Sequence, residues 1–171
     1  DSAFIFTEME EGKIDYSAFA NYRFIILNSL VSVSSGLATE LRKFIDNGGS
    51  LLVMPGRNAE VDSYNALLNP LGLAGYGPAV VDTGLRPVSH LNFNHPLYQG
   101  VFESTNGRMD MPATVKPYAI KTNSQSREDE LMRLQDGNLF LASYRVGKGN
   151  VYLSAVGLYG DFGNFQHHAL F

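Results

Sequence analysis

Cysteine is absent from the 171-residue sequence, and its absence narrows the chemistry open to the protein. Without cysteine there are no disulfides, no thiolate metal ligands and no cysteine nucleophile. No run of about 18 apolar residues occurs, so the sequence predicts no membrane-spanning helix. The net charge is −4, and the 13 Lys and Arg residues form no basic stripe. This distribution argues against nucleic-acid binding.

Hydrophobic residues make up 44% of the sequence, which is enough for a sizeable core. A chain of this length buries roughly two-thirds of the surface that its unfolded form exposes, so we expect one domain over residues 1–171. The sequence starts without an initiator Met, shows no signal-peptide pattern and stops on the apolar ending "HHALF". We therefore expect a domain cut from a longer protein.

Residues 24–54 have the pattern of a strand–helix–strand crossover unit. The run "FIIL", residues 24–27, is continuously apolar, which suits a strand covered on both faces. A helix should follow, with Ser34 or Ser35 as its N-cap and Gly48 at its end. The apolar residues of that helix recur at the spacing of one helix face: Leu37, Leu41, Phe44 and Ile45. Residues 51–54 then form a second buried strand, parallel to the first.

The C-terminal third predicts antiparallel strands. The segments "DELMRL" and "LFLASYRV" flank Asp136-Gly137, a strong hairpin signal, and "VYLSAV" follows a second tight reversal at residues 147–149. Residues 75–122 contain only short strand candidates, such as residues 78–82. The predicted fold is α/β: a three-layer sandwich with a mainly parallel, flavodoxin-like central sheet, extended by C-terminal antiparallel hairpins.

Four polar residues follow the two predicted parallel strands, where ligands of open α/β sheets bind. Asn28 and Ser29 come after the first strand, and Arg57 and Asn58 come after the second. Arg57 can hold a carboxylate or phosphate by a two-pronged contact, while the two Asn side chains supply amide hydrogen bonds. These four residues are the candidate ligand-binding set of a small anionic-ligand sensor. The alternative is that Pro55-Gly56 only turns the chain and that Arg57 is solvated.

No catalytic residue is predicted at this position. A nucleophile elbow reads G-x-S-x-G or G-x-C-x-G, whereas "LVMPG" has Met54 at the central position. A thioether has no proton to lose and cannot be activated as a hydroxyl or thiol can. The remaining enzyme hypothesis is a hydrolase or transferase with a rearranged site. It would pair Ser29, Ser32 or Asp161 with one of two histidines, His95 or His167.

No metal site or cofactor is predicted. The four histidines include no HExxH or HxH arrangement, and the adjacent pair His167-His168 favours a surface position. His95-Pro96 is typical of a turn in which Asn94 or His95 caps the local backbone. "VGKG" joins two predicted strands, whereas a phosphate-binding loop should lead into a helix.

The order of these parts resembles the class I glutamine amidotransferase-like fold. "YRFIILNS" is similar to that family's strand before the oxyanion loop, and "FIDNGGSLLVMPG" is similar to its helix and the strand with the catalytic cysteine. By this resemblance Met54 stands at the nucleophile position. His95-Pro96 is followed by Leu97, so the family's His-Pro-Glu motif has no counterpart. The resemblance therefore implies the framework without glutaminase activity.

Four segments resemble, more specifically, the amidotransferase-like domain of membrane-anchored proteins of the Bat aerotolerance type: "SGLATELRKFIDNGGSLLVMPG", "NHPLYQGVF", "YRVGKGNVYLSAV" and "NFQHHALF". This resemblance implies a non-catalytic binding or scaffold module on the extracytoplasmic (periplasmic) face of a cell envelope. Its expected partners are other domains of the parent protein or envelope proteins, with no nucleic acid and no insertion of this fragment into the membrane.

Overall fold

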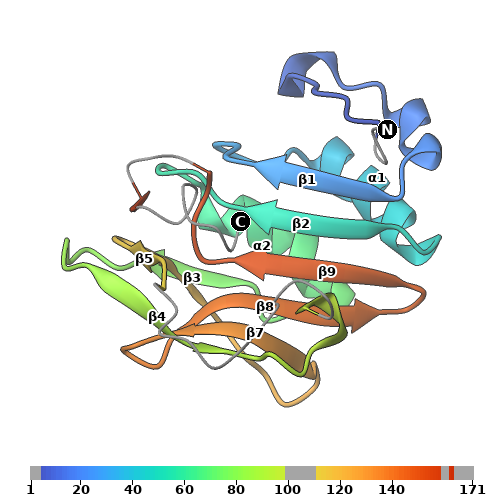
Figure 1. The fold of residues 1–171 in the computed structure, drawn as a ribbon. Helices are drawn as coiled ribbons and strands as arrows, with labels where there is room; N and C mark the ends of the chain where they lie inside the picture. Colours follow the sequence, from blue (N-terminus) through green and yellow to red (C-terminus); the bar gives the residue numbers. More distant parts are fainter. Residues whose placement is uncertain (1–4, 99–110, 159–161, 164–171) are drawn as a thin grey trace.

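A curled, mixed sheet of seven strands organises the structure, a computed structural model that describes residues 5–98, 111–158, 162 and 163 (Figure 1). Only two neighbouring pairs, β1–β2 and β2–β9, are parallel, and the four other pairs are antiparallel. A separate antiparallel pair joins β3 (Tyr76–Ala79) to β6 (Tyr118–Ile120). The strands of the large sheet, in spatial order, are β1 (Phe24–Asn28), β2 (Ser50–Met54), β9 (Gly149–Ser154), β8 (Leu139–Val146), β7 (Glu128–Leu134), β4 (Arg86–Leu91) and β5 (Ala113–Thr114).

The three-layer, mainly parallel, flavodoxin-like sandwich expected from the sequence is wrong. The protein is mostly β, and its two α-helices, α1 (Ser35–Asp46) and α2 (Val61–Leu68), lie on the same face of the sheet (Figure 1). A parallel sheet needs a crossover between each pair of strands. The tight turns between β7, β8 and β9 impose antiparallel pairing instead, so the sheet is mixed and the second helical layer is missing from the described residues. Four short 3-10 helices complete the described elements: η1 (Glu11–Lys13), η2 (Tyr16–Asn21), η3 (Asn69–Leu71) and η4 (Pro96–Tyr98).

The predicted crossover unit β1–α1–β2 is confirmed. Ser34 is the N-cap of α1, where its hydroxyl oxygen accepts a hydrogen bond from the Leu37 N–H at 3.3 Å. Gly48 ends the helix region with φ +98°, a conformation that glycine adopts without strain. The apolar face of α1 packs on the sheet, and the four predicted core residues, Leu37, Leu41, Phe44 and Ile45, are all buried.

The predicted C-terminal hairpins are also confirmed. Gly137 adopts φ +87° in the turn between β7 and β8, and the second reversal pairs Val146 with Gly149. The strand candidate at residues 78–82 overlaps β3 only at residues 78 and 79, and β4, β5 and β6 have no named counterpart in the sequence prediction. Residues 99–110 lie outside the described part. Within the described residues, the helices are all too short or too polar to cross a membrane.

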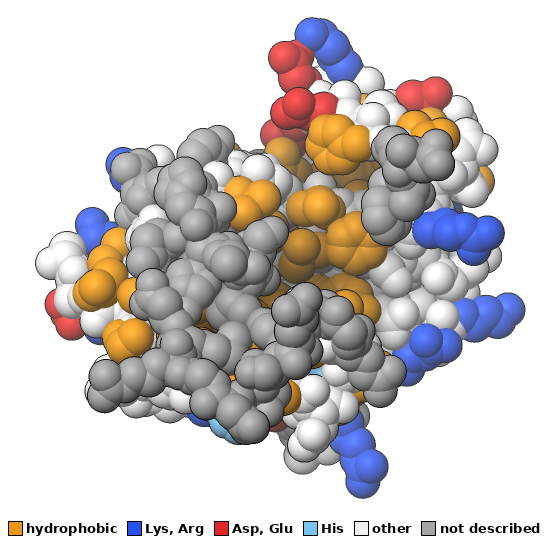
Figure 2. Space-filling view, in the orientation of Figure 1, with side chains coloured by type: hydrophobic (Ala, Val, Ile, Leu, Met, Phe, Trp, Pro, Cys, Tyr) orange, Lys and Arg blue, Asp and Glu red, His pale blue; other side chains and the backbone are white. Residues whose placement is uncertain are grey.

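The open face of β1 departs from the expectation that this strand is covered on both sides. Phe24 is 47% exposed and Ile26 is 42% exposed, whereas Leu27 is buried. The reason is that β1 is an edge strand and both α-helices lie on the opposite face. Hydrophobic side chains consequently gather on the face seen in Figure 2. Parallel pairing aligns Ile26 with Leu52, and Leu52 with Tyr152, across that face.

Candidate functional site

The loops that follow β1, β2 and β9 pack against one another at the carboxyl ends of the parallel strands. We call this region of close loop contact the crossing. Ser29 follows β1 with φ +62°, an uncommon conformation for a residue other than glycine. Its N–H donates to the Met54 carbonyl at 2.8 Å, and its hydroxyl donates to Asn28 Oδ1 at 3.0 Å. The Leu158 N–H donates to the same Asn28 oxygen at 3.2 Å. The side-chain oxygen of Asn28 is therefore committed to internal hydrogen bonds.

Two glycines let the loops of this crossing approach without an intervening side chain. A Cβ atom on Gly56 would lie 2.9 Å from the carbonyl oxygen of Ser29. A Cβ on Gly157 would lie 2.7 Å from the carbonyl oxygen of Pro55 and would collide with the Ser29 hydroxyl. These are distances that real Cβ atoms do not tolerate. The loops after β1, β2 and β9 are thus packed against one another, which leaves no room between them for a ligand.

Three tyrosine hydroxyls hold the crossing from the helical side. Tyr76 Oη lies 2.9 Å from the Ser154 carbonyl and 3.2 Å from the Val53 carbonyl, so one hydroxyl bridges the ends of β9 and β2. Tyr64 Oη donates to the Leu30 carbonyl at 2.7 Å. Burial raises the pKa of Tyr76 and of Tyr64 well above the ordinary value, so both stay neutral donors.

The third hydroxyl, on Tyr118, fixes the turn that contains the predicted Arg57 and Asn58. Its oxygen accepts from the Ala59 N–H at 3.1 Å and lies 2.9 Å from the Gly56 carbonyl. Arg57 and Asn58 themselves are exposed at the tip of this turn. No pattern in the sequence indicated the three tyrosine contacts, since each joins groups that lie far apart along the chain.

Met54 occupies the position predicted for it, at the end of β2 inside the crossing. Its side chain is 4% exposed, and its carbonyl accepts the hydrogen bond from Ser29. The neighbouring hydroxyl of Ser29 faces a carboxamide oxygen, which does not accept a proton at neutral pH and cannot serve as a general base. The described crossing therefore contains a thioether and an unactivated hydroxyl.

The histidines of the rearranged-site hypothesis do not meet these hydroxyls in the described structure. His95 Nδ1 accepts from the Leu97 N–H at 3.1 Å, which is the local backbone cap expected from the sequence. Among the described residues, neither Ser29 nor Ser32 has a histidine partner. Asp161, His167 and His168 lie outside the described residues, as does any contact that they make. The described part of the chain holds no group of three His, Asp or Glu residues suited to a metal ion.

A groove of about 300 Å³ lies beside β1, next to the crossing. The N-terminal segment, residues 6–14, forms one wall, and β1 with Leu158 forms the other. Asn28 lines this groove, whereas Ser29, Arg57 and Asn58 do not. The structure therefore does not gather the four predicted ligand-binding residues around one cavity. Their role as a ligand set stays a prediction, and the groove is a feature that the sequence reasoning missed.

Comparison with known proteins gives the fold alone. No family model matches the chain, and neither does any curated protein. Among solved structures, cytoplasmic protein STM1381 from Salmonella typhimurium LT2 is similar with a TM-score of 0.65 and 16% identity, covering 91% of this chain and 71% of that one. Cytoplasmic protein STM3548 from Salmonella typhimurium has a TM-score of 0.61 and 13% identity, covering 84% of this chain and 63% of that one.

A third similar structure is the β-galactosidase from Rahnella sp. R3, with a TM-score of 0.54 and 16% identity over 87% of this chain. The chain spans 22% of that enzyme, so the enzyme's activity says nothing about this domain. The amidotransferase-like and Bat-type resemblance stays a prediction. The aerotolerance and membrane-anchoring roles that it implied find no support in these structures, two of which are named as cytoplasmic proteins.

Proposed function

We propose that the domain is a non-catalytic binding or scaffold module. The observation that supports this most strongly is the closed crossing at the strand ends. In open α/β sheets, ligands bind beyond the carboxyl ends of the parallel strands, so a reactive group and its ligand would be expected at this position. Instead Met54 is buried, the Asn28 oxygen accepts two internal hydrogen bonds, and Gly56 and Gly157 bring the loops into contact.

A hydrolase needs an activated nucleophile, and Ser29 lacks the partner that would activate it. Its hydroxyl hydrogen is donated to an amide oxygen at 3.0 Å, so the arrangement orients the loop and draws no proton away. The left-handed conformation of Ser29 serves the same end, because it turns the chain over Gly56 at the edge of the crossing. The geometry thus favours a structural role for the residue.

The proposal extends to the setting of the module. On the sequence resemblance, the domain works on the extracytoplasmic face of a cell envelope, beside other domains of its parent protein or envelope proteins. Protease added to spheroplasts, in which the periplasmic face of the membrane is accessible, and to lysed cells of the source organism tests this. Digestion of the domain in both samples would support a position outside the cytoplasm. Digestion only after lysis would reject the extracytoplasmic setting.

An activity panel with matched variants tests the absence of catalysis. The purified domain is assayed with glutamine, activated carboxylic esters, phosphate esters and aryl glycosides, beside Ser29→Ala and Ser126→Ala. Ser126 is the matched control because its hydroxyl also donates to a carboxamide oxygen, Asn123 Oδ1, at 2.8 Å. We expect no turnover above buffer from any of the three proteins. Turnover that Ser29→Ala abolishes and Ser126→Ala retains would overturn the proposal.

A further inference from the structure

The edge strand β1 presents unpaired backbone groups in an extended conformation. The Ser50 N–H donates to the Arg23 carbonyl at 3.0 Å, and the Ser29 N–H donates to the Met54 carbonyl at 2.8 Å. Peptide groups alternate in direction along a strand, so those of Ile25 and Leu27 also face β2. The N–H and C=O groups of Phe24 and Ile26 therefore point to the free edge. No described residue forms a backbone hydrogen bond with them.

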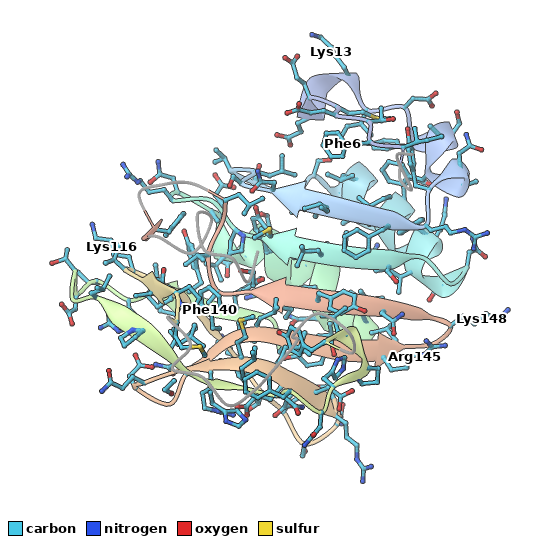
Figure 3. The ribbon with its side chains drawn as sticks, viewed as in Figure 1. Phe6, Lys13, Lys116, Phe140, Arg145 and Lys148 are labelled. Carbon is cyan, nitrogen blue, oxygen red and sulfur yellow. The ribbon has the colours of Figure 1, made fainter. Side chains whose placement is uncertain are left out.

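Both walls of the groove beside this edge carry apolar side chains. Phe6, labelled in Figure 3, lies on the N-terminal segment next to β1 and is largely exposed. Phe24 and Ile26 supply exposed apolar side chains from the strand, and the Phe24 ring lies 6.1 Å from that of Tyr152 on the open face of the sheet. An exposed edge strand with no charge, proline or bulge is a template for pairing with another chain. The five residues of β1, "FIILN", have none of these protective features.

The charged side chains that line the groove are all acidic. Glu8 and Glu11 line it, and no Lys or Arg does. The neighbouring Glu10 is neutralised by Lys13 at 2.6 Å, whereas neither Glu8 nor Glu11 has an ion pair within the described residues. An occupant that brings cationic side chains to this wall is favoured, and an anionic lipid surface is not.

We propose that the free edge of β1 binds an extended segment of a partner protein, which adds to the sheet as a further strand. Its backbone pairs with Phe24 and Ile26, its apolar side chains cover the open face, and a Lys or Arg lies near Glu8 and Glu11. This inference rests on the proposed function as a binding module and names the surface and the class of partner. A second copy of β1 fits less well, because the strand has no cation to offer to the acidic wall.

The test measures binding of a defined probe, a blocked peptide of about nine residues that alternates Val and Thr and has Lys at each end. Fluorescence anisotropy gives its affinity for the domain. A second peptide is N-methylated on alternate residues, on the face that would pair with β1, and a third has Glu in place of Lys. We expect the first peptide to bind, and each of the other two to bind at least about tenfold more weakly.

Two variants of one position separate backbone pairing from apolar contact. Ile26→Pro removes a free-edge N–H without touching the bonds to β2, and proline is tolerated on edge strands. Ile26→Thr keeps the N–H and a β-branched side chain. We expect Ile26→Pro to weaken binding about tenfold and Ile26→Thr to weaken it only about two- to threefold. If Ile26→Pro does not fold, the N-methylated peptide still probes the same hydrogen bonds.

A charge variant tests the acidic wall. Glu8→Gln/Glu11→Gln should weaken the Lys-ended peptide about two- to fivefold and flatten the salt dependence of its affinity. Three outcomes would each overturn the inference. The N-methylated peptide could bind as tightly as the Lys-ended peptide, the Lys-ended peptide could fail to bind, or the domain could form a dimer through pairing of two β1 strands. These outcomes leave the non-catalytic module standing, whereas turnover dependent on Ser29 removes the module whatever the peptides do.

Discussion

The hydroxyl of Tyr76 shows how a single buried polar atom holds two strand ends together. It lies between the carbonyl oxygens of Ser154 and Val53, and the residue is 1% exposed. The hydroxyl of Tyr144 is buried as well but has no hydrogen-bond partner among the described residues. A buried polar group contributes to stability only when it is paired, so these two tyrosines should respond in opposite ways to loss of the hydroxyl.

Tyr76→Phe should destabilise the domain by about 1–3 kcal/mol, because it leaves two buried carbonyl groups without their shared donor. The matched variant Tyr144→Phe should be neutral or stabilising by up to about 1 kcal/mol, because it removes an unpaired hydroxyl. Urea unfolding of both variants measures the two free energies. Equal losses of stability in the two variants would show that the Tyr76 bridge has no special weight.

Residue-level prediction succeeded where neighbouring residues decide the local structure and failed where distant groups meet. The buried thioether of Met54 and the local cap by His95 both follow from neighbouring residues, and both are present in the structure. The hydroxyl contacts of Tyr64, Tyr76 and Tyr118 join groups 23 to 78 positions apart. No periodicity or motif encodes such a contact, since it depends on the finished packing.

At the scale of elements, Gly157 sets how closely the loop after β9 approaches the loops after β1 and β2. Gly157→Ala places a methyl group against the Ser29 hydroxyl and the Pro55 carbonyl. We expect a loss of about 2–4 kcal/mol, since backbone cannot move aside as a flexible side chain does. Thermal unfolding monitored by circular dichroism measures this loss.

Gly36→Ala is the matched control for that prediction. Gly36 lies in the first turn of α1. A Cβ atom added to it would lie 3.8 Å from Tyr16 Oη, its nearest neighbour, which is an ordinary van der Waals contact. Alanine should therefore be neutral or stabilise the domain by about 0.5–1 kcal/mol. A stable Gly157→Ala variant beside a normal Gly36→Ala variant would mean that the crossing has spare room after all.

Element-level prediction was good for α1 and for the hairpin at Asp136-Gly137, because each has a local signal: a helical apolar period, and a turn that needs positive φ. The layers were mispredicted for a physical reason. A run such as "FIIL" has the same composition whether one face or both faces are covered. Only the position of β1 at the sheet edge explains why Phe24 and Ile26 stay exposed.

The whole molecule joins a short parallel half to an antiparallel half through β9, and buried tyrosines lie in both halves. Burial raises the pKa of Tyr144 and of Tyr98 to about 12, and it raises the pKa values of Tyr64 and Tyr76 well above their ordinary value. Each is neutral in the folded state at a pH where the unfolded chain ionises. Their contribution to stability is therefore complete below the ordinary pKa of 10.0 and is lost as the pH rises through the folded values.

We expect the tyrosine contribution to the free energy of unfolding to stay constant from neutral pH to about pH 10. The free energy of unfolding should then fall steeply between about pH 10 and 12. Tyrosinate absorbance followed together with circular dichroism should show that the four buried tyrosines ionise in the same step in which the protein unfolds. The Tyr144→Phe variant should unfold at higher pH than the wild type. Reversible ionisation of all nine tyrosines near pH 10 in a fully folded protein would mean that these four side chains are not buried as described.

Hydrogen exchange at single amides tests most directly whether the free edge of β1 is the binding surface of the molecule. The amides of Phe24 and Ile26 point outward, while those of Ile25 and Leu27 already face β2. With the Lys-ended peptide at saturation, exchange at Phe24 and Ile26 should slow by about tenfold or more, and exchange at Ile25 and Leu27 should change little. Uniform slowing of all four amides, or no change at Phe24 and Ile26, would contradict strand addition at this edge.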